Sequence, residues 1–336
     1  MIRAAIVGLG TWGQNLVTSV QGKSSLIQFT AGATRTPAKA AAFAKAHGIA
    51  LVDDYAQLLS DPAVDAVVLA TPHSQHSAQI VAAARAGKAV FTEKPLGLDL
   101  AETLAAVQAC ADHQVTLAVG YNWRFQPALR AVKAMLDDGR LGRLMHIEGN
   151  FCGPSAYRFP AGHWRHAPDE TPGGGMTGRG VHVVDAMLYL GGPIESVVAQ
   201  SLRLAQDFGV DDTTSMLFKF RGGSTGYLGT VIATAETWRM QVFGSNGWAE
   251  VGDVEHLATW ELRTCFVDRA NVMVKHPPQV TRFEKTSTER EELENFARAV
   301  ASGSRLALPA GDEEHNVAVL EAIMRSIEHG TREAVA

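Results

Sequence analysis

Three glycines near the N-terminus have the spacing of a phosphate-binding turn. Gly8, Gly10 and Gly13 follow a continuous apolar run at residues 2–7 and precede a helix-like stretch that reaches Gln21. In such a turn the first glycine permits a tight bend, the second lets the backbone approach a pyrophosphate, and the third lets helix and strand pack closely. The N–H groups at the start of the helix then face the anion. A plain strand-to-helix turn is the other interpretation, but the context favours a dinucleotide site. Its residues are Gly8, Leu9, Gly10, Thr11, Trp12 and Gly13.

The end of the second expected strand, residues 27–33, bears on which dinucleotide is bound. A carboxylate here normally binds the 2′-hydroxyl of the NAD ribose, yet the sequence continues Thr34-Arg35-Thr36 and has no acid before Asp53. Thr34 and Arg35 can donate hydrogen bonds and positive charge to a 2′-phosphate instead. The sequence therefore favours NADP(H). NAD(H) is the alternative if Arg35 is only a solvated surface charge.

Glu93-Lys94-Pro95 is a second candidate site. The motif follows an expected strand at residues 89–92, which places it at a carboxyl end of the sheet. Ligands of open α/β sheets bind along this edge. The other interpretation of Lys94 is a surface lysine that forms a salt bridge with Glu93.

Strand-like and helix-like stretches alternate through the first 120 residues, which implies βαβ units and a parallel sheet. Strands are expected at residues 2–7, 27–33, 64–70, 89–92 and 115–119. From about Tyr121 the chain shows period-two stretches and the hairpin turn 221–224, which imply a largely antiparallel sheet. The expected strands there are 144–151, 194–204, 213–220 and 226–233, and the expected helices are 127–137, 181–190, 287–302 and 312–329.

The composition is typical of a globular chain with two domains. The chain has 336 residues, of which 46% are hydrophobic and 19% are charged. Its net charge is 30 − 35 = −5 without a basic block, so no nucleic-acid partner is expected. There is no signal-peptide pattern and no apolar run long enough for a bilayer, so we expect a cytoplasmic protein with no membrane partner.

Neither the cysteines nor the histidines show metal-binding spacing. Three cysteines lie far apart, without a paired-cysteine motif, and are expected to be free thiols. His163, His166 and His182 lack an HExxH or cysteine-rich context, so no metal is expected.

Several motifs in order resemble the Gfo/Idh/MocA family of oxidoreductases, and the resemblance covers essentially the whole chain. The motifs are the glycine turn, Thr71-Pro72 followed by His76, Ala86-Gly87-Lys88, Glu93-Lys94-Pro95, Arg124-Phe125 with Pro127, Gly173-Gly174-Gly175, and Gly180-Val181-His182 with Asp185. The resemblance implies an α/β fold with an N-terminal Rossmann dinucleotide-binding domain, residues 1–121. A C-terminal α+β domain for substrate binding and oligomerisation, residues 122–336, would have an open, mainly antiparallel sheet. Its last helices could pack back on the first domain.

The resemblance also implies an activity. Family members move a hydride between nicotinamide and a carbinol carbon, so we expect an NAD(P)-dependent dehydrogenase or reductase of a small sugar, polyol or carboxylate-bearing relative. By resemblance the catalytic residues are Lys94, which contacts the reacting hydroxyl, and His182. A lysine with a free pKa of about 10.4 suits proton transfer only if burial and the positive nicotinamide lower its pKa to about 7–8. A cis bond is expected at Lys94-Pro95.

Further contacts follow from the resemblance. Additional cofactor-binding residues are expected to be Thr71, Pro72, His73, His76, Glu93, Lys94 and Asn122. Substrate-binding residues are expected to be Lys94, Arg124, Trp164, Arg165, Arg179 and His182.

One position departs from the family pattern. The family usually has an Asp four residues before the histidine, where this chain has Gly178 followed by Arg179. The change makes the local charge more positive by about two units. It predicts a substrate with a carboxylate or another anionic group, held by Arg179 together with Arg165 or Arg124. Alternatively, Arg179 points to solvent or pairs with Asp169, Glu170 or Asp185.

Two other functions remain open at this point. A catalytically silent NAD(P)-binding sensor or regulatory protein would account for Gly178, although Lys94 and His182 are retained. A non-redox member with a tightly held cofactor is the other alternative. A homodimer or homotetramer is expected, and the alternating apolar residues of 216–220 and 227–232 could form its interface, though a core face has the same pattern.

Overall fold

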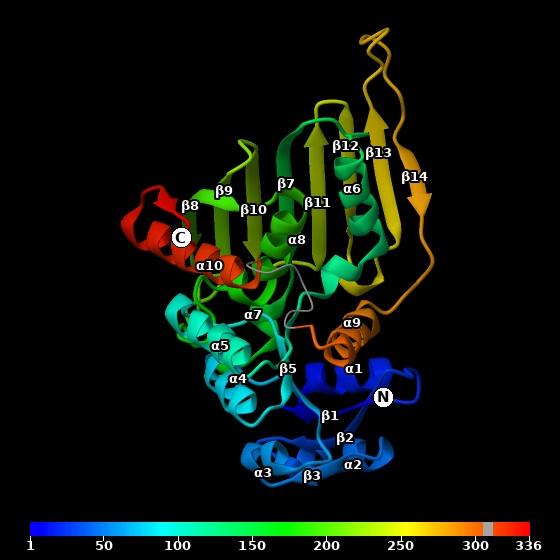
Figure 1. The fold of residues 1–336 in the computed structure, drawn as a ribbon. Helices are drawn as coiled ribbons and strands as arrows, with labels where there is room; N and C mark the ends of the chain where they lie inside the picture. Colours follow the sequence, from blue (N-terminus) through cyan, green and yellow to red (C-terminus); the bar gives the residue numbers. More distant parts are fainter. Residues whose placement is uncertain (305–311) are drawn as a thin grey trace. The chain divides into compact units, whose positions relative to one another are not determined.

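The first sheet is parallel, as the alternation in the sequence predicts, and has six strands where five were expected. The computed structural model describes residues 1–304 and 312–336, and its first sheet has the order β3-β2-β1-β4-β5-β6 (Figure 1). The winding direction changes between β1 and β4, the switch point at which open α/β sheets bind ligands. The strands are β1 Ile2–Val7, β2 Ile27–Ala33, β3 Ala50–Val52, β4 Ala66–Leu69, β5 Ala89–Glu93 and β6 Leu117–Gly120.

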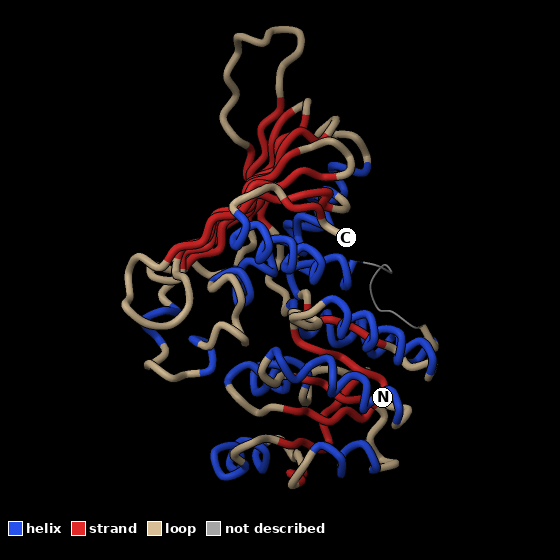
Figure 2. The backbone as a smooth tube through the Cα atoms, turned by 90° about the vertical axis from the view of Figure 1, so that its left-hand side faces the viewer, coloured by secondary structure: helices blue, strands red, loops and turns tan. Residues whose placement is uncertain are grey.

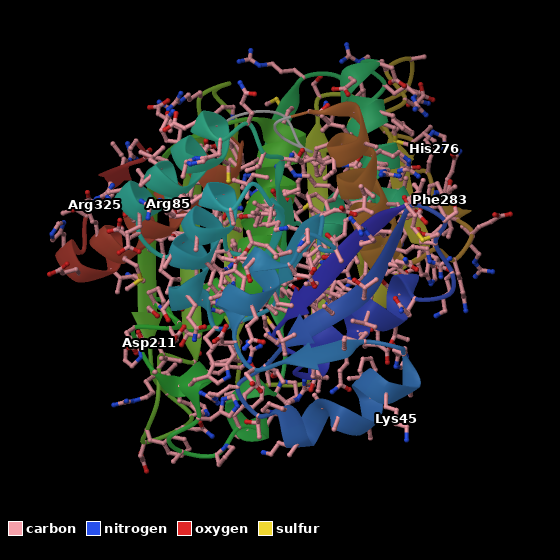
Figure 3. The ribbon with its side chains drawn as sticks, turned by 60° about the horizontal axis from the view of Figure 1, so that its bottom comes forward. Lys45, Arg85, Asp211, His276, Phe283 and Arg325 are labelled. Carbon is pink, nitrogen blue, oxygen red and sulfur yellow. The ribbon has the colours of Figure 1, made fainter. Side chains whose placement is uncertain are left out.

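The helices of this part begin and end at ordinary sequence signals. Pro37 occupies the first turn of α2, and Asp99 caps α5 by accepting a hydrogen bond from the Glu102 N–H at 2.8 Å. Lys45 and Arg85 lie in the last turns of α2 and α4, where a positive charge is favourable. Both residues are exposed, and Figure 3 labels them. The helices are α1 Thr11–Val20, α2 Pro37–Ala46, α3 Tyr55–Ser60, η1 His73–Gln75, α4 His76–Arg85 and α5 Leu100–Asp112.

A helix from the C-terminal part of the chain completes the core of the first sheet. Helix α9, Thr288–Ser302, begins after Ser287, whose hydroxyl accepts the Arg290 N–H at 3.2 Å. Its residues Leu293 and Phe296 are fully buried in the cluster formed with β1, β2 and α1. The ring of Phe296 meets that of Phe91 on β5 edge-on at 5.8 Å between centroids.

The second sheet has nine strands in the order β14-β13-β12-β11-β7-β10-β9-β8-β15. Its pairs are antiparallel except β7 with β10, so the mainly antiparallel sheet predicted from the sequence is confirmed. The strands are β7 Leu144–Cys152, β8 Ile194–Leu202, β9 Thr213–Phe220, β10 Thr225–Val231, β11 Thr237–Gly244, β12 Gly247–Asp253, β13 Glu261–Phe266, β14 Gln279–Arg282 and β15 Glu333–Ala334. The period-two pattern predicts none of the strands that follow residue 236.

Helices cover one face of this sheet (Figure 2). Helix α8 lies against β7, and α6 contacts both α8 and β12. Helix α8 is buried on nearly all sides, as its continuous apolar sequence requires. The remaining helical segments are η2 Asn122–Phe125, α6 Pro127–Asp137, α7 Ser155–Arg158, η3 Trp164–His166, η4 Met176–Gly180, α8 Val181–Gly191, η5 His256–Ala258 and α10 Asp312–His329.

The apolar alternation along β9 and β10 belongs mainly to the covered face. Met216, Phe218 and Leu228 are buried, whereas the alternate residues Leu217 and Tyr227 are exposed. The pattern that could have marked an interface is therefore largely a core pattern.

The described chain folds into two compact units. The first contains Met1–Asn122 and Ser287–Val317, and the second contains Trp123–Thr286 and Ala318–Ala336. The domain boundary expected after residue 121 stays a proposal. Helix α9, although it comes late in the chain, belongs to the first unit. Over the residues that the structure describes, no helix combines the length and apolarity needed to cross a membrane.

Candidate functional site

The glycine turn has the geometry that a bound phosphate requires. Gly8 adopts a φ of +95°, and a Cβ there would lie against the Ala70 carbonyl. A Cβ on Gly13 would collide with the Gly8 carbonyl, which fits its predicted role in close packing. A Cβ on Gly10 would meet no described heavy atom within 4 Å. Gly10 therefore faces open space at the start of α1, where an anion can approach the backbone.

The end of β2 lies directly beside this turn. Val7 pairs with Ala33, and the Gly8 N–H donates to the Ala33 carbonyl at 2.8 Å. Thr34 and Arg35 thus leave the sheet next to the phosphate-binding turn. Arg35 is exposed and forms no ion pair with any residue in the described ranges. Its charge is available to a ligand on this edge.

The loop after β4 is held to the Glu-Lys-Pro motif by a buried histidine. The His76 ring nitrogens lie 2.8 Å from the Pro95 carbonyl (Nδ1) and 3.1 Å from the Thr71 carbonyl (Nε2). The Lys94-Pro95 bond is cis, which confirms the expectation from the sequence. His73 is also buried, and its ring meets His76 edge-on. The contacts of His76 indicate a positioning role, because both its nitrogens face the protein backbone.

Glu93 is a buried acid with an altered pKa. Its side chain is 6% exposed, and one oxygen accepts the Lys94 backbone N–H at 3.3 Å. Burial raises the pKa of Glu93 to about 7, and the charge of Glu289 contributes to the rise, whereas the Trp12 indole and Lys94 oppose it. A carboxyl group with this pKa changes its charge near neutral pH.

Glu289, at the start of α9, has no signal in the sequence that would mark it as a site residue. Its carboxylate accepts hydrogen bonds from Asn15 at 3.3 Å and from the Ser287 hydroxyl at 3.1 Å. The neighbouring Thr288 hydroxyl accepts the Asn122 side-chain amide at 3.3 Å. Asn122, an expected cofactor contact, is therefore held by the same helix start that places Glu289 near Glu93.

The raised pKa of Glu93 predicts a pH-dependent stability. The folded pKa of about 7 exceeds the ordinary value of 4.5, so this group favours the folded state at low pH. That contribution is lost as the pH rises to about 7, by on the order of 3 kcal/mol. Glu93→Gln should therefore gain unfolding free energy relative to the wild type between pH 4.5 and 7.5. Urea unfolding of both proteins without cofactor measures this difference, and parallel pH profiles would contradict it.

In the second unit, His182 lies among aromatic side chains. It is the second residue of α8, which directly follows the π-helical turn η4, a type of distortion common at functional sites. Its ring stacks on Trp123 at 5.4 Å between centroids and an interplanar angle of 20°. Phe151 and His256 lie within 6.1 and 6.3 Å of the same ring. Trp123 is 1% exposed, so its indole packs in the interior of the second unit.

Arg124 is neutralised inside the second unit. Its guanidinium donates to both carboxylate oxygens of Asp185 at 2.7–3.0 Å, and the side chains are 4% and 0% exposed. A buried pair of this kind leaves Arg124 poorly placed to exchange its partner for a substrate anion. The geometry favours an internal brace between η2 and α8 over the predicted substrate clamp.

Arg179 is also paired, with an acid that lies far from it in the sequence. Its Nη1 donates to Glu236 at 2.6 Å and to the Cys152 carbonyl at 2.9 Å. The guanidinium lies over the Phe151 ring at 4.6 Å. A Cβ on Gly153 would collide with both members of the pair, so this glycine makes room for them. The alternatives Asp169, Glu170 and Asp185 are not the acidic partner of Arg179 in the structure.

The expected residues therefore form two groups. The glycine turn, Thr34, Arg35, Glu93, Lys94 and Asn122 belong to the first unit. Arg124, Trp164, Arg165, Arg179 and His182 belong to the second. The juxtaposition of Lys94 with His182 stays a prediction. Within residues 1–304 and 312–336 there is no cluster of three His, Cys, Asp or Glu side chains suited to a metal ion.

Comparisons with known proteins agree with this two-part organisation. The profile of an oxidoreductase family with an NAD-binding Rossmann fold matches residues 2–121, and the profile of the GFO/IDH/MocA C-terminal domain matches residues 129–250. The chain is 32% identical to D-xylose 1-dehydrogenase (NADP(+)) 2 of Haloferax volcanii, covering 96% of this chain and 97% of that protein. It is 29% identical to scyllo-inositol 2-dehydrogenase (NAD(+)) of Bacillus subtilis, covering 98% and 95%. The crystal structure of aldose-aldose oxidoreductase from Caulobacter crescentus in complex with glycerol shares the fold, with a TM-score of 0.88, 23% identity and 99% coverage of both chains.

Proposed function

The chain belongs to the GFO/IDH/MocA family of oxidoreductases, and from this membership we propose its substrate class, its cofactor preference and the roles of its site residues. It is an NAD(P)-dependent enzyme that transfers a hydride between nicotinamide and a hydroxyl or carbonyl carbon of a small polar molecule. We propose a sugar, a polyol or a carboxylate-bearing relative as the substrate, because relatives along the whole chain are named for xylose and inositol.

The open space in front of Gly10 is the observation that most supports the cofactor site. Gly8 makes the turn, and the free approach at Gly10 leaves the N–H groups of α1 to a pyrophosphate. When bound, the nicotinamide accepts or donates the hydride. Asn122, Thr71 and Glu93 are proposed to contact the cofactor.

Lys94 and His182 are proposed to handle the proton. A hydroxyl carbon that loses hydride must also lose its hydroxyl proton, so a group near the oxygen must accept it. Lys94 follows β5 at the ligand-binding edge of the first sheet. His182 can hydrogen-bond the same oxygen, since imidazole donates or accepts near neutral pH.

Turnover distinguishes this function from a silent sensor. The protein is incubated with NADPH or NADH and a panel of aldoses, ketoses and inosose-type ketones, and reduced cofactor is followed by absorbance. Loss of absorbance with at least one carbonyl supports the enzyme. Tight cofactor binding without turnover in either direction would support a sensor or regulatory protein.

We propose that Arg35 makes the enzyme prefer NADP(H). Arg35 follows Ala33, whose carbonyl accepts the Gly8 N–H, by two residues; its side chain is exposed and forms no ion pair with described residues. A charged hydrogen bond to the 2′-phosphate contributes roughly 1.5–3 kcal/mol, so Arg35→Ala should reduce the NADPH-over-NADH ratio of kcat/KM roughly 10- to 100-fold. Arg85→Ala, which removes an exposed arginine elsewhere in this unit, is the matched control. An unchanged ratio in Arg35→Ala would overturn the preference.

A homo-oligomer and a cytoplasmic location complete the proposal. The exposed side chains of Leu217 and Tyr227 on the second sheet support contacts between copies. Val272 and Met273 support them further, because they are 70% and 84% exposed in the loop between β13 and β14. Light scattering in solution distinguishes monomer, dimer and tetramer.

A further inference from the structure

We propose that Arg165 forms the anion-binding subsite of the second unit and that the substrate is a hydroxy or keto compound with a carboxylate. This inference rests on the proposed dehydrogenase function and names the substrate class more narrowly. Of the three arginines that the sequence suggests as a clamp, Arg124 is paired with Asp185 and Arg179 with Glu236. Arg165 has no carboxylate partner anywhere in the described chain.

Aromatic rings hold the Arg165 side chain. Its guanidinium carbon lies 4.3 Å from the centroid of the Trp164 ring and 5.5 Å from that of Phe159. The His163 ring stacks on Phe159 at 4.4 Å, and its Nδ1 accepts the Arg165 backbone N–H at 3.2 Å. A side chain held in this way has lost part of its rotational freedom before a ligand binds, which lowers the entropic cost of binding.

The charges around Arg165 are positive. Burial lowers the pKa of the Arg165 guanidinium, and the charges of Arg158 and Arg179 lower it further. An arginine nevertheless keeps its charge at neutral pH. Arg158 is exposed and has no ion pair in the part of the chain described by the structure. Glu236 compensates the charge of Arg179, whereas Arg165 and Arg158 have no ion pair among the described residues, so an anionic ligand would compensate their charge.

The subsite is linked to the predicted reaction site by contacts within the second unit. Arg179, whose charge acts on Arg165, lies over the Phe151 ring at 4.6 Å. The Phe151 ring is in turn 6.1 Å from that of His182. In this proposal one small substrate presents a carboxylate to Arg165 and a hydroxyl to His182, both of which belong to the second unit.

A carboxylate fits these groups better than a phosphate ester. One guanidinium fork matches one carboxylate bidentately. Because Glu236 already neutralises Arg179, only the exposed Arg158 could serve a second negative charge. Sugar acids and related hydroxy acids are thus the expected class, and sugar phosphates form the contrasting arm of the test.

The test compares acid and neutral substrates of one carbon skeleton. Initial rates are measured for D-glucose, D-glucuronate and D-glucose 6-phosphate with wild type, Arg165→Ala, Arg165→Lys and Arg221→Ala. Arg221 is an exposed arginine in the β9–β10 turn and controls for net charge. The loss of kcat/KM in Arg165→Ala should be roughly 10- to 100-fold larger for glucuronate than for glucose. Arg165→Lys should recover part of it, and Arg221→Ala should show no difference between the substrates.

Calorimetric titration of glucuronate into the protein–NADPH complex gives a readout that does not need turnover. Weaker binding to Arg165→Ala than to Arg221→Ala supports the subsite even if the chosen sugars do not react. Equal losses for glucose and glucuronate, together with unchanged glucuronate affinity, overturn it while leaving the dehydrogenase assignment intact. A larger loss for the phosphate than for the carboxylate overturns the carboxylate assignment. If no carbonyl supports hydride transfer but glucuronate binding still depends on Arg165, the proposed dehydrogenase function is rejected and the subsite is retained.

Discussion

Lys94→Ala is expected to lower kcat for hydride transfer roughly 10²- to 10⁴-fold, the usual contribution of a positioned acid–base group. The expectation depends on the place of Lys94 directly after β5, at the edge where open α/β sheets bind ligands. Single-turnover reduction with saturating NADPH measures the chemical step separately from release of the product. Cofactor affinity, measured by fluorescence titration, should fall much less than the rate.

Lys94→Arg separates proton transfer from charge. Arginine keeps the positive charge beside Glu93 but does not release a proton near neutral pH. The arginine variant should therefore be nearly as slow as the alanine variant, and its pH–rate profile should lose the limb due to Lys94. A rate within about threefold of the wild type in Lys94→Ala would contradict an acid–base role.

Gly10→Ala is expected to weaken cofactor binding at least about tenfold with little effect on stability. A Cβ at this position meets no described heavy atom within 4 Å, so the folded chain can accommodate it. The same Cβ would occupy the space through which a pyrophosphate approaches the start of α1. Titration with NADPH and thermal unfolding without cofactor measure the two effects separately.

Two other glycines provide the controls for that result. Gly13→Ala should destabilise the protein itself, because its Cβ would collide with the Gly8 carbonyl. Gly22→Ala introduces strain at a φ of +70° without any contact within 4 Å among described atoms, away from the turn. It should lower stability modestly and leave cofactor affinity unchanged. If Gly10→Ala binds NADPH as the wild type does, the phosphate cradle is wrongly placed.

The structure compensates part of the charge change at positions 178 and 179 through an ion pair that the sequence pattern does not predict. Glu236, the residue before β11, neutralises Arg179. The two side chains meet beside Gly153. The predicted shift of about two charge units is therefore reduced at Arg179 itself. The uncompensated charge lies at Arg165, held between aromatic rings. This is why the anionic-substrate hypothesis moves from Arg179 to Arg165.

Local patterns in the sequence determined the first unit and its motifs. The glycine spacing, the apolar run of β1 and the Glu-Lys-Pro motif after β5 each act over a few residues, and steric limits on the backbone fix their structure. Period-two alternation likewise predicted β7 and β9. Strand β3 was missed because its three residues are too few to show a period and are not fully buried.

Only the tertiary structure decided which charges meet. Arg124 with Asp185 and Arg179 with Glu236 form ion pairs between residues from distant parts of the chain, and the charge of Glu289 raises the pKa of the distant Glu93. Ion pairing depends on distances that fall below about 4 Å only after strands and helices pack, and sequence spacing does not encode those distances. The identity of the chemical groups is therefore a property of the sequence. Their charge states, their partners and the arginine left for an anion are properties of the folded chain.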